Sequence, residues 1–92
     1  MSGEIRASHI LVKTEKEADS IIIELQNEKN FADLAKRYSM CPSKSQGGDL
    51  GWFGKGMMVP EFEEAAFSAK INTPVKVKTQ FGWHIIIVTD AE

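Results

Sequence analysis

The sequence predicts an α+β domain that contains an antiparallel sheet. Two stretches in the first half carry apolar residues at helical spacing, and segments rich in β-branched residues lie towards both ends of the chain. The predicted elements follow in the order β, α, α, loop, β, α, β, β, which indicates an antiparallel α+β arrangement. At 92 residues the chain is expected to form a single domain, residues 1–92, in which helices and strands share one core.

The first half of the chain predicts one strand and two helices. Residues 5–13 alternate weakly and are apolar on both sides, which is typical of a strand covered on both faces. Thr14 and Glu17 form a capping-box pattern that begins a helix, and this helix is expected to end near Asn27 to Asn30. Asn30 is itself placed to cap a second helix over 31–38. Each helix carries one apolar stripe that needs a sheet to cover: Ala18, Ile21, Ile22 and Leu25 in the first, and Phe31, Leu34, Ala35 and Tyr38 in the second.

The second half of the chain predicts a loop, a third helix and three strands. We expect a loop over 39–48 with one short helical turn after Pro42, a strand over 50–53, a helix over 61–69 with Pro60 in its first turn, a strand over 75–78, a turn over 79–82 and a strand over 83–89. The last of these runs is almost continuously β-branched. It is therefore predicted to be the central strand of the sheet.

Composition and charge argue against several classes of function. The chain has 11 Lys plus Arg against 13 Asp plus Glu, so no strong attraction to nucleic acid is expected. No apolar run reaches the roughly 18 residues that a membrane-spanning helix needs, and the N-terminus lacks the apolar segment of a signal peptide. The single cysteine, Cys41, excludes an internal disulfide and fits a reducing compartment. We expect a cytoplasmic monomer, or an extracytoplasmic domain if the chain was cut from a longer secreted protein.

A glycine-rich apolar segment over residues 46–62 is the most unusual feature of the sequence. It holds five of the seven glycines, interleaved with aromatic and methionine side chains that favour burial. The spacing fits no phosphate-binding loop, because the glycines at 51, 54 and 56 match neither GxGxxG nor GxxxxGK[ST]. A packed structural connection and the lining of an apolar pocket both remain open from these residues alone, and Met57 fits core filler as well as ligand contact.

Five short motifs, in this order and at this spacing, resemble the parvulin family of peptidyl-prolyl cis/trans isomerases. The motifs are Ala7-Ser8-His9-Ile10-Leu11-Val12-Lys13, residues 31–39, Gly47-Gly48-Asp49-Leu50-Gly51, Met58-Val59-Pro60-Glu61-Phe62 and Gln80-Phe81-Gly82-Trp83-His84-Ile85-Ile86. The resemblance covers nearly the whole chain. It implies a four-stranded antiparallel sheet surrounded by helices, and an enzyme that rotates Xaa-Pro bonds in peptides and unfolded clients without a cofactor or a metal.

The resemblance also implies a site with an apolar and a polar part. Carried onto this chain, the proline pocket is formed by Leu50, Met58, Phe62 and Phe81, and the polar cluster beside it by His9, Cys41, Thr79 and His84. We expect the two histidines on neighbouring strands, where their ring nitrogens also serve a structural role by linking the strands to the Cys41 loop. Trp52 and Phe53 are expected to extend the apolar rim.

Cys41 is the member of the polar cluster whose role is least defined by the sequence. Our hypothesis is that it presents a polar or partly anionic group to the rotating carbonyl. Two other arrangements of the same residue types are disfavoured. A zinc site needs four ligands, and the next candidate, Asp49, lacks ligand spacing; a Cys/His protease needs an oxyanion hole and a substrate cleft in only 92 residues.

Substrate selectivity is predicted from one absent feature and two apolar residues. Relatives that require phosphorylated Ser or Thr before proline carry a long basic loop after the first strand, whereas Lys13 here leads directly into the helix cap at Thr14. We therefore expect no phosphate requirement, and Phe81 and Val59 should favour apolar residues near the proline. The alternative function is a proline-peptide-binding or chaperone module with little turnover.

Overall fold

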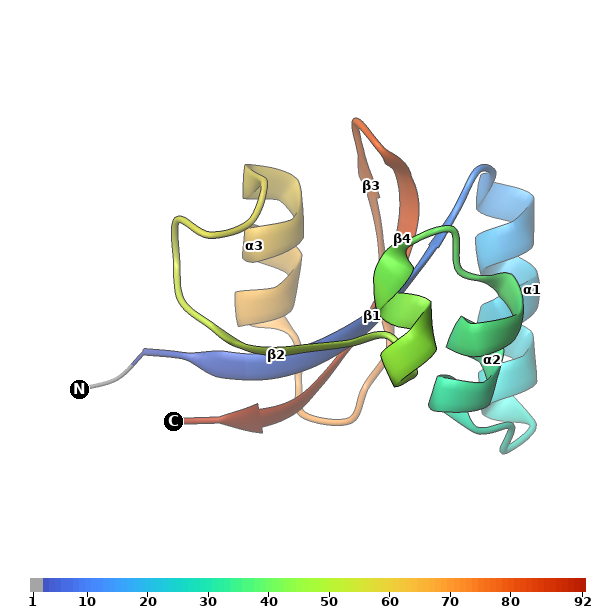
Figure 1. The fold of residues 1–92 in the computed structure, drawn as a ribbon, viewed down its shortest axis with the longest axis horizontal. Coiled ribbons are helices and arrows are strands. Elements are labelled where there is room, and N and C mark those ends of the chain that lie inside the picture. The colour runs from blue at the N-terminus through green and yellow to red at the C-terminus, as the bar shows by residue number, and fades with distance from the viewer. Residues whose placement is uncertain (1–2) are drawn as a thin grey trace.

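A computed structural model describes residues 3–92 of the chain (Figure 1). Its elements are β1 (Ile5–Val12), α1 (Glu15–Gln26), α2 (Phe31–Tyr38), the 3₁₀ helix η1 (Pro42–Gln46), β2 (Asp49–Phe53), α3 (Pro60–Ser68), β3 (Val75–Thr79) and β4 (Gly82–Ala91). The predicted order of elements is confirmed. α1 ends one to four residues before the predicted end at 27–30, and the other bounds differ from the predicted ones by no more than two residues. The short helical turn expected after Pro42 is η1.

The four strands form one antiparallel sheet in the order β2-β1-β4-β3. β4 pairs with β1 on one side and with β3 on the other, so the β-branched run near the C-terminus is a central strand, as predicted. β1 is the second central strand, which explains why its residues are apolar on both sides. At the outer end of the sheet, the Glu92 N–H donates to the Glu4 carbonyl at 3.0 Å, and the two ends of the described chain lie side by side (Figure 1).

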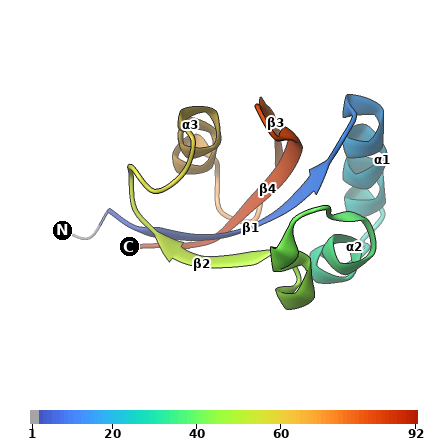
Figure 2. The same cartoon turned by 45° about the horizontal axis from the view of Figure 1, so that its top comes forward.

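Helices cover both faces of the sheet, and each face has its own apolar core (Figure 2). On one face α3 packs against β3 and β4, with a core of Ile5, Ala7, Phe53, Phe62, Ala66, Ile86 and Val88. On the other face α1 and α2 pack against β1 and β4, with a core of Ile10, Val12, Ala18, Ile21, Leu34, Ala35 and Ile85. The predicted helical stripes supply most of this second core. Among residues 3–92, no helix is both long and apolar enough to cross a membrane.

Hydrogen bonds at the helix starts match the sequence signals. The Thr14 hydroxyl oxygen accepts from the Glu17 N–H at 3.2 Å and its O–H donates to the Glu17 carboxylate at 2.9 Å. The Asn30 side chain accepts from the Asp33 N–H at 3.1 Å and so caps α2. Tyr38 departs from the prediction, because this last residue of α2 is exposed, with the Arg37 guanidinium over its ring.

The predicted apolar rim of Trp52 and Phe53 is wrong. The Phe53 side chain is 1% exposed and lies in the core under α3, where it packs against the rings of Phe62 and Phe67. Trp52 points to the opposite face of the sheet, is exposed and does not line the cavity described below. Strand alternation explains the outcome, because neighbouring residues of β2 must face opposite sides.

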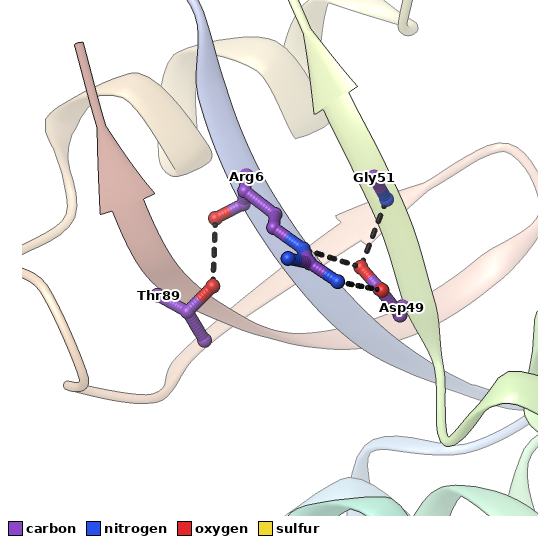
Figure 3. A network of polar contacts seen from close by, with 4 residues as sticks. All are labelled: Arg6, Asp49, Gly51 and Thr89. Atoms are coloured by element: carbon purple, nitrogen blue, oxygen red, sulfur yellow. Dashed lines mark hydrogen bonds and ion pairs between the residues drawn. The ribbon is translucent and has the colours of Figure 1, made fainter.

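An exposed polar network joins three strands on the face opposite α3 (Figure 3). The Arg6 guanidinium of β1 donates to both carboxylate oxygens of Asp49 on β2, at 3.3 and 2.6 Å. Asp49 also accepts from the Gly51 N–H at 2.9 Å, and the Thr89 hydroxyl of β4 donates to the Arg6 carbonyl at 3.3 Å. Arg6 is the residue at which β1 shifts register against both β2 and β4, so this network lies at an irregular point of the sheet.

Candidate active site

Three buried polar residues from three strands meet on the α3 face of the sheet. His9 of β1 and His84 of β4 are 5% and 4% exposed, and Thr79 ends β3. The register places Leu11 opposite His84. His9 is two residues from Leu11 along β1 and so lies on the same face, where its ring reaches that of His84. The expectation that the two histidines lie on neighbouring strands is confirmed.

The three side chains form a hydrogen-bonded chain. His84 Nε2 lies 2.8 Å from Thr79 Oγ1, and His84 Nδ1 lies 2.9 Å from His9 Nδ1. Thr79 Oγ1 also accepts from the Phe81 N–H at 3.1 Å. A neutral imidazole carries one N–H, so the proton on the shared Nδ1 contact belongs to one ring and the other ring accepts it. His9 Nε2 is buried and has no hydrogen-bond partner among residues 3–92, so it is the open end of this hydrogen-bonded series.

Burial keeps both imidazoles neutral at pH 7. Loss of solvation, with a smaller contribution from the neighbouring His84, lowers the pKa of His9 to about 4. Burial also lowers the pKa of His84. The polar part of the site thus carries dipoles and hydrogen bonds but no formal charge on its histidines.

Phe62 connects this polar chain to the apolar part of the site. Its ring meets the His9 ring at 78° and the His84 ring at 85°, with centroids 5.5 and 5.2 Å apart. The planes of the two imidazoles are nearly parallel, at 17°, with centroids 5.1 Å apart. Phe62 lies in the first turn of α3, which begins at Pro60, and is 3% exposed. This edge-to-face packing fixes the orientation of both imidazoles.

An apolar cavity of about 430 Å³ opens above Phe62 and the two histidines. Its size is in the range of ligand-binding pockets, and its walls are almost entirely apolar. It is lined by His9, Leu11, Met40, Cys41, Pro42, Leu50, Met57, Met58, Val59, Phe62, Phe81 and His84. The structure therefore brings together all the predicted site residues except Thr79, which lies behind His84 and reaches the cavity only through it.

The glycine-rich segment supplies one wall of this cavity. Leu50 of β2 and the residues Met57, Met58 and Val59 of the loop between β2 and α3 line it, which favours the pocket reading of this segment over a purely structural connection. Met57 is 64% exposed at the cavity mouth, so it is not core filler. Gly48 is required for a different reason. A Cβ there would lie 2.4 Å from the His9 carbonyl oxygen, so only glycine allows the loop to approach β1 this closely.

Cys41 lies at the opposite wall, just before the 3₁₀ helix η1. Its backbone N–H donates to the Ser39 hydroxyl at 3.3 Å, and the same oxygen accepts from the Leu11 N–H at 3.0 Å. The Met40 N–H donates to the Leu11 carbonyl at 2.8 Å, so this segment is attached to β1. Cys41 is partly buried and lines the cavity, and within residues 3–92 its thiol has no hydrogen bond to either imidazole.

Three further lining residues were not predicted from the sequence. Leu11 could have been found, because it alternates with His9 along β1 and so shares its face. Met40 and Pro42 carry no comparable signal, since only the attachment of their segment to β1 brings them to the cavity. In the described part of the chain, no three His, Cys, Asp or Glu side chains lie close enough together to hold a metal ion.

Comparisons with known proteins agree with this geometry. The profile of the PPIC-type PPIase domain matches residues 1–92. The chain is 56% identical over 91 residues to the foldase protein PrsA of Geobacillus sp. (strain WCH70), covering 97% of this chain and 33% of that protein. It spans about one third of the length of the curated PrsA relatives that it matches.

Two solved structures show the same fold. The peptidylprolyl isomerase PrsA from Bacillus anthracis superposes with a TM-score of 0.95 at 46% identity, covering 97% of this chain and 42% of that one. NmPin, the parvulin of Nitrosopumilus maritimus, has a TM-score of 0.88 at 41% identity and covers 97% of this chain and 98% of its own. The chain therefore belongs to the family of PPIC-type peptidyl-prolyl cis/trans isomerase domains, and it has the parvulin fold.

Proposed function

We propose that the cavity binds the proline of an Xaa-Pro segment and lowers the barrier to rotation about the preceding peptide bond. That barrier is roughly 18–20 kcal/mol, because amide resonance is lost when the bond twists. No covalent bond has to break, so positioning and environment are sufficient. The observation that carries the proposal is one apolar cavity whose floor is formed by Phe62 and two uncharged, hydrogen-bonded histidines.

The apolar walls supply the first part of the mechanism. Leu50, Met58 and Phe62 surround the space in which the proline ring would sit, and Phe81 lies at its rim. A ring held there is fixed while the preceding carbonyl remains free to turn. The planar amide is more polar than the twisted one, so removal of water favours the twisted state. Binding therefore becomes tighter as the bond rotates.

The polar chain supplies the second part. Thr79 holds His84, and His84 holds His9, so the polar surface under the amide cannot reorient freely. Because both histidines are neutral, they place dipoles rather than a charge beside the rotating group. His9, Thr79 and His84 act as positioning residues in this proposal.

Cys41 is proposed to face the turning carbonyl from the opposite wall and to stabilise the twisted state by its polarity. Replacement of the thiol with a carboxylate tests this role without opening a cavity. Cys41→Asp should keep most of kcat/KM, and Cys41→Ala should lower it roughly tenfold, an amount equal to about 1.4 kcal/mol. A Cys41→Ala enzyme with the full isomerase rate would remove the electrostatic role.

Substrate selectivity is proposed to be independent of phosphate. The connection between β1 and α1 contains only Lys13 and Thr14, which leaves no loop able to surround a phosphate. Phe81 and Met57 are exposed at the cavity mouth, where they favour apolar residues beside the proline. The test compares a phosphoserine-proline peptide with its unmodified form. Equal or slower turnover of the phosphorylated peptide is expected, and much faster turnover would refute the proposal.

Turnover itself separates the isomerase from the binding module. NMR exchange spectroscopy on a panel of Xaa-Pro tetrapeptides should show cis/trans exchange that is faster than the uncatalysed process, which takes tens to hundreds of seconds. Chemical-shift changes at Leu50, Met58 and Phe62 without faster exchange would favour the module. The same panel measures which residue is preferred before proline.

The clients are proposed to be flexible or unfolded protein segments, which fits the foldase name of the relatives. The single-domain organisation over residues 1–92 and the monomeric state remain predictions. Measurement of the molar mass by light scattering tests the monomeric state. The expected cytoplasmic location receives no support from the relatives. It remains a prediction beside the extracytoplasmic alternative for a domain of a longer foldase, and fractionation of the source cells distinguishes the two.

A further inference from the structure

The loop between β2 and α3, residues 54–59, forms a wall of the cavity and contains no helix or strand of its own. It leaves the end of β2 as an arch and returns to the first turn of α3 (Figures 1 and 2). Met57 lies in its outer part, and Met58 and Val59 lie on the side of the α3 core. Something outside the loop must fix the position of this wall.

Glu63 holds the loop on both sides of its two methionines. Its carboxylate accepts from the Gly56 N–H at 2.6 Å, and its own N–H donates to the Val59 carbonyl at 2.9 Å. Met57 and Met58 lie between these two attachment points. Hydrogen bonds from a backbone N–H to a carboxylate are among the stronger ones in proteins. Glu63 is only partly exposed, unlike Glu61 and Glu64 on either side of it.

Two weaker contacts support the same arrangement. The Lys55 ammonium lies 5.7 Å from the centre of the Phe67 ring, so a second residue of α3 contacts the loop. The Gly54 N–H donates to the Met57 sulfur at 3.3 Å inside the loop. Both contacts are exposed and contribute little. Gly56 has a φ of 93°, a conformation that glycine adopts readily.

We propose that Glu63 is a positioning residue that sets the width of the proline pocket by fixing the Met57-Met58 wall. This inference rests on the proposed function of the cavity. Loss of the carboxylate frees Gly56 and lets the wall move outward, which weakens the grip on the proline ring. The planar and the twisted forms of the bound peptide lose this contact alike. The substitution should therefore weaken peptide binding and leave the rate of rotation nearly unchanged.

The experiment compares three variants at the start of α3. Glu63→Ala should raise KM for an apolar Xaa-Pro peptide about fivefold and change kcat less than twofold. Glu63→Gln keeps a side-chain oxygen that can accept from Gly56, so it should stay within about twofold of the parent protein. Glu64→Ala is the matched control, because this neighbour is exposed and, within the described part of the chain, the hydrogen bond to Gly56 comes from Glu63.

Two readouts independent of turnover keep the inference separate from the proposed function. The amide proton of Gly56 should shift upfield in Glu63→Ala and not in Glu64→Ala, and Kd for the same peptide, measured by NMR titration, should rise about fivefold. If the parent protein binds peptide but does not accelerate exchange, the proposed function is wrong while the Kd comparison still tests Glu63. If Glu63→Ala matches Glu64→Ala in KM and Kd, the inference is wrong even for an active enzyme.

Discussion

The two polar networks of this domain use similar hydrogen bonds in opposite surroundings. The chain Thr79-His84-His9 lies buried under α3, whereas Arg6 and Asp49 join β1 and β2 on the opposite face, with side chains that are 45% and 30% exposed (Figure 3). The exposed pair has formal charges and a distance of 2.6 Å, and the buried chain has none on its histidines. Judged by contact geometry alone, the ion pair would contribute more to stability than the buried hydrogen bonds.

Solvent reverses that ranking. An exposed ion pair replaces good hydration and is screened by salt, so its net contribution is about 0–1 kcal/mol. A buried polar group that loses its partner has no water to replace it and costs about 1–3 kcal/mol. The buried network therefore governs both stability and the site, and the exposed one serves mainly to secure an irregular part of β1. Four measurements test this difference, and they are given from the largest expected effect to the smallest.

Removal of the central member of the buried chain should have the largest effect. His84→Ala leaves Thr79 and His9 without their shared partner and opens a cavity beside Phe62, so the free energy of unfolding should fall by about 3–5 kcal/mol. Urea denaturation measures this loss, and peptide exchange should return to the uncatalysed rate. A loss below about 1 kcal/mol would place the buried chain on a par with the exposed pair.

Acid should weaken the same buried hydrogen-bonded network and lower the stability of the domain without any mutation. The pKa of His9 is lowered from 6.5 to about 4 by folding, so the unfolded chain takes up its proton first as the pH falls. The stabilisation is complete above pH 6.5, is lost between pH 6.5 and 4, and does not fall further below pH 4. The lowered pKa of His84 acts in the same direction.

The pH effect is measured by urea denaturation at pH 7.5 and pH 4.5. His9 alone should contribute a loss of about 2–3 kcal/mol over this interval. His9→Leu is the control, because carboxylates titrate equally in both proteins and only the His9 contribution disappears. An equal drop in parent and variant would show that His9 is not held neutral by burial.

Thr79 permits a smaller and more selective change. Thr79→Val keeps the shape of the side chain but leaves His84 Nε2 and the Phe81 N–H without a partner, so it should cost about 1–3 kcal/mol and lower kcat/KM. Thr79→Ser retains the hydroxyl and should recover most of the activity. If Val and Ser behave alike, the hydrogen bond is not what the site requires of residue 79.

Arg6→Ala should have the smallest effect. Arg6 does not line the cavity, so kcat/KM should be unchanged, and stability should fall by less than about 1 kcal/mol. The Arg6 guanidinium lowers the pKa of Asp49, but this coupling is exposed and should weaken as salt is added. A double-mutant cycle with Asp49→Ala measures it. A coupling of several kcal/mol would contradict the comparison of the two networks.

Local pattern predicted most of the fold and one half of the site. Capping residues, helical stripes and the β-branched run near the C-terminus gave the elements, because each signal is contained within a few neighbouring residues. The glycine-rich segment pointed to an apolar wall for the same reason. The polar group of His9, Cys41, Thr79 and His84 came only through the resemblance to a family, since their proximity depends on strand pairing.

The errors and omissions have a shared physical cause. Phe53 and Trp52 are predicted to form one rim although the strand must turn them to opposite faces, and Tyr38, the last residue of the predicted α2 stripe, is exposed. Met40 is bound to the backbone of Leu11 in a distant strand, and Glu63 to the backbone of Gly56 in the adjoining loop, and no periodicity in the sequence reports such contacts. Long-range attachment of loops is what the sequence alone did not reveal.

The hydrogen bond between Glu92 and Glu4 has a consequence for engineering. The start of β1 and the end of β4 are already adjacent. This domain could therefore be inserted into a host protein in place of a surface turn, because the two connections to the host would begin close together. By the same geometry, a short peptide linking the two ends would allow new termini to be opened elsewhere, in a circularly permuted enzyme with the same pocket.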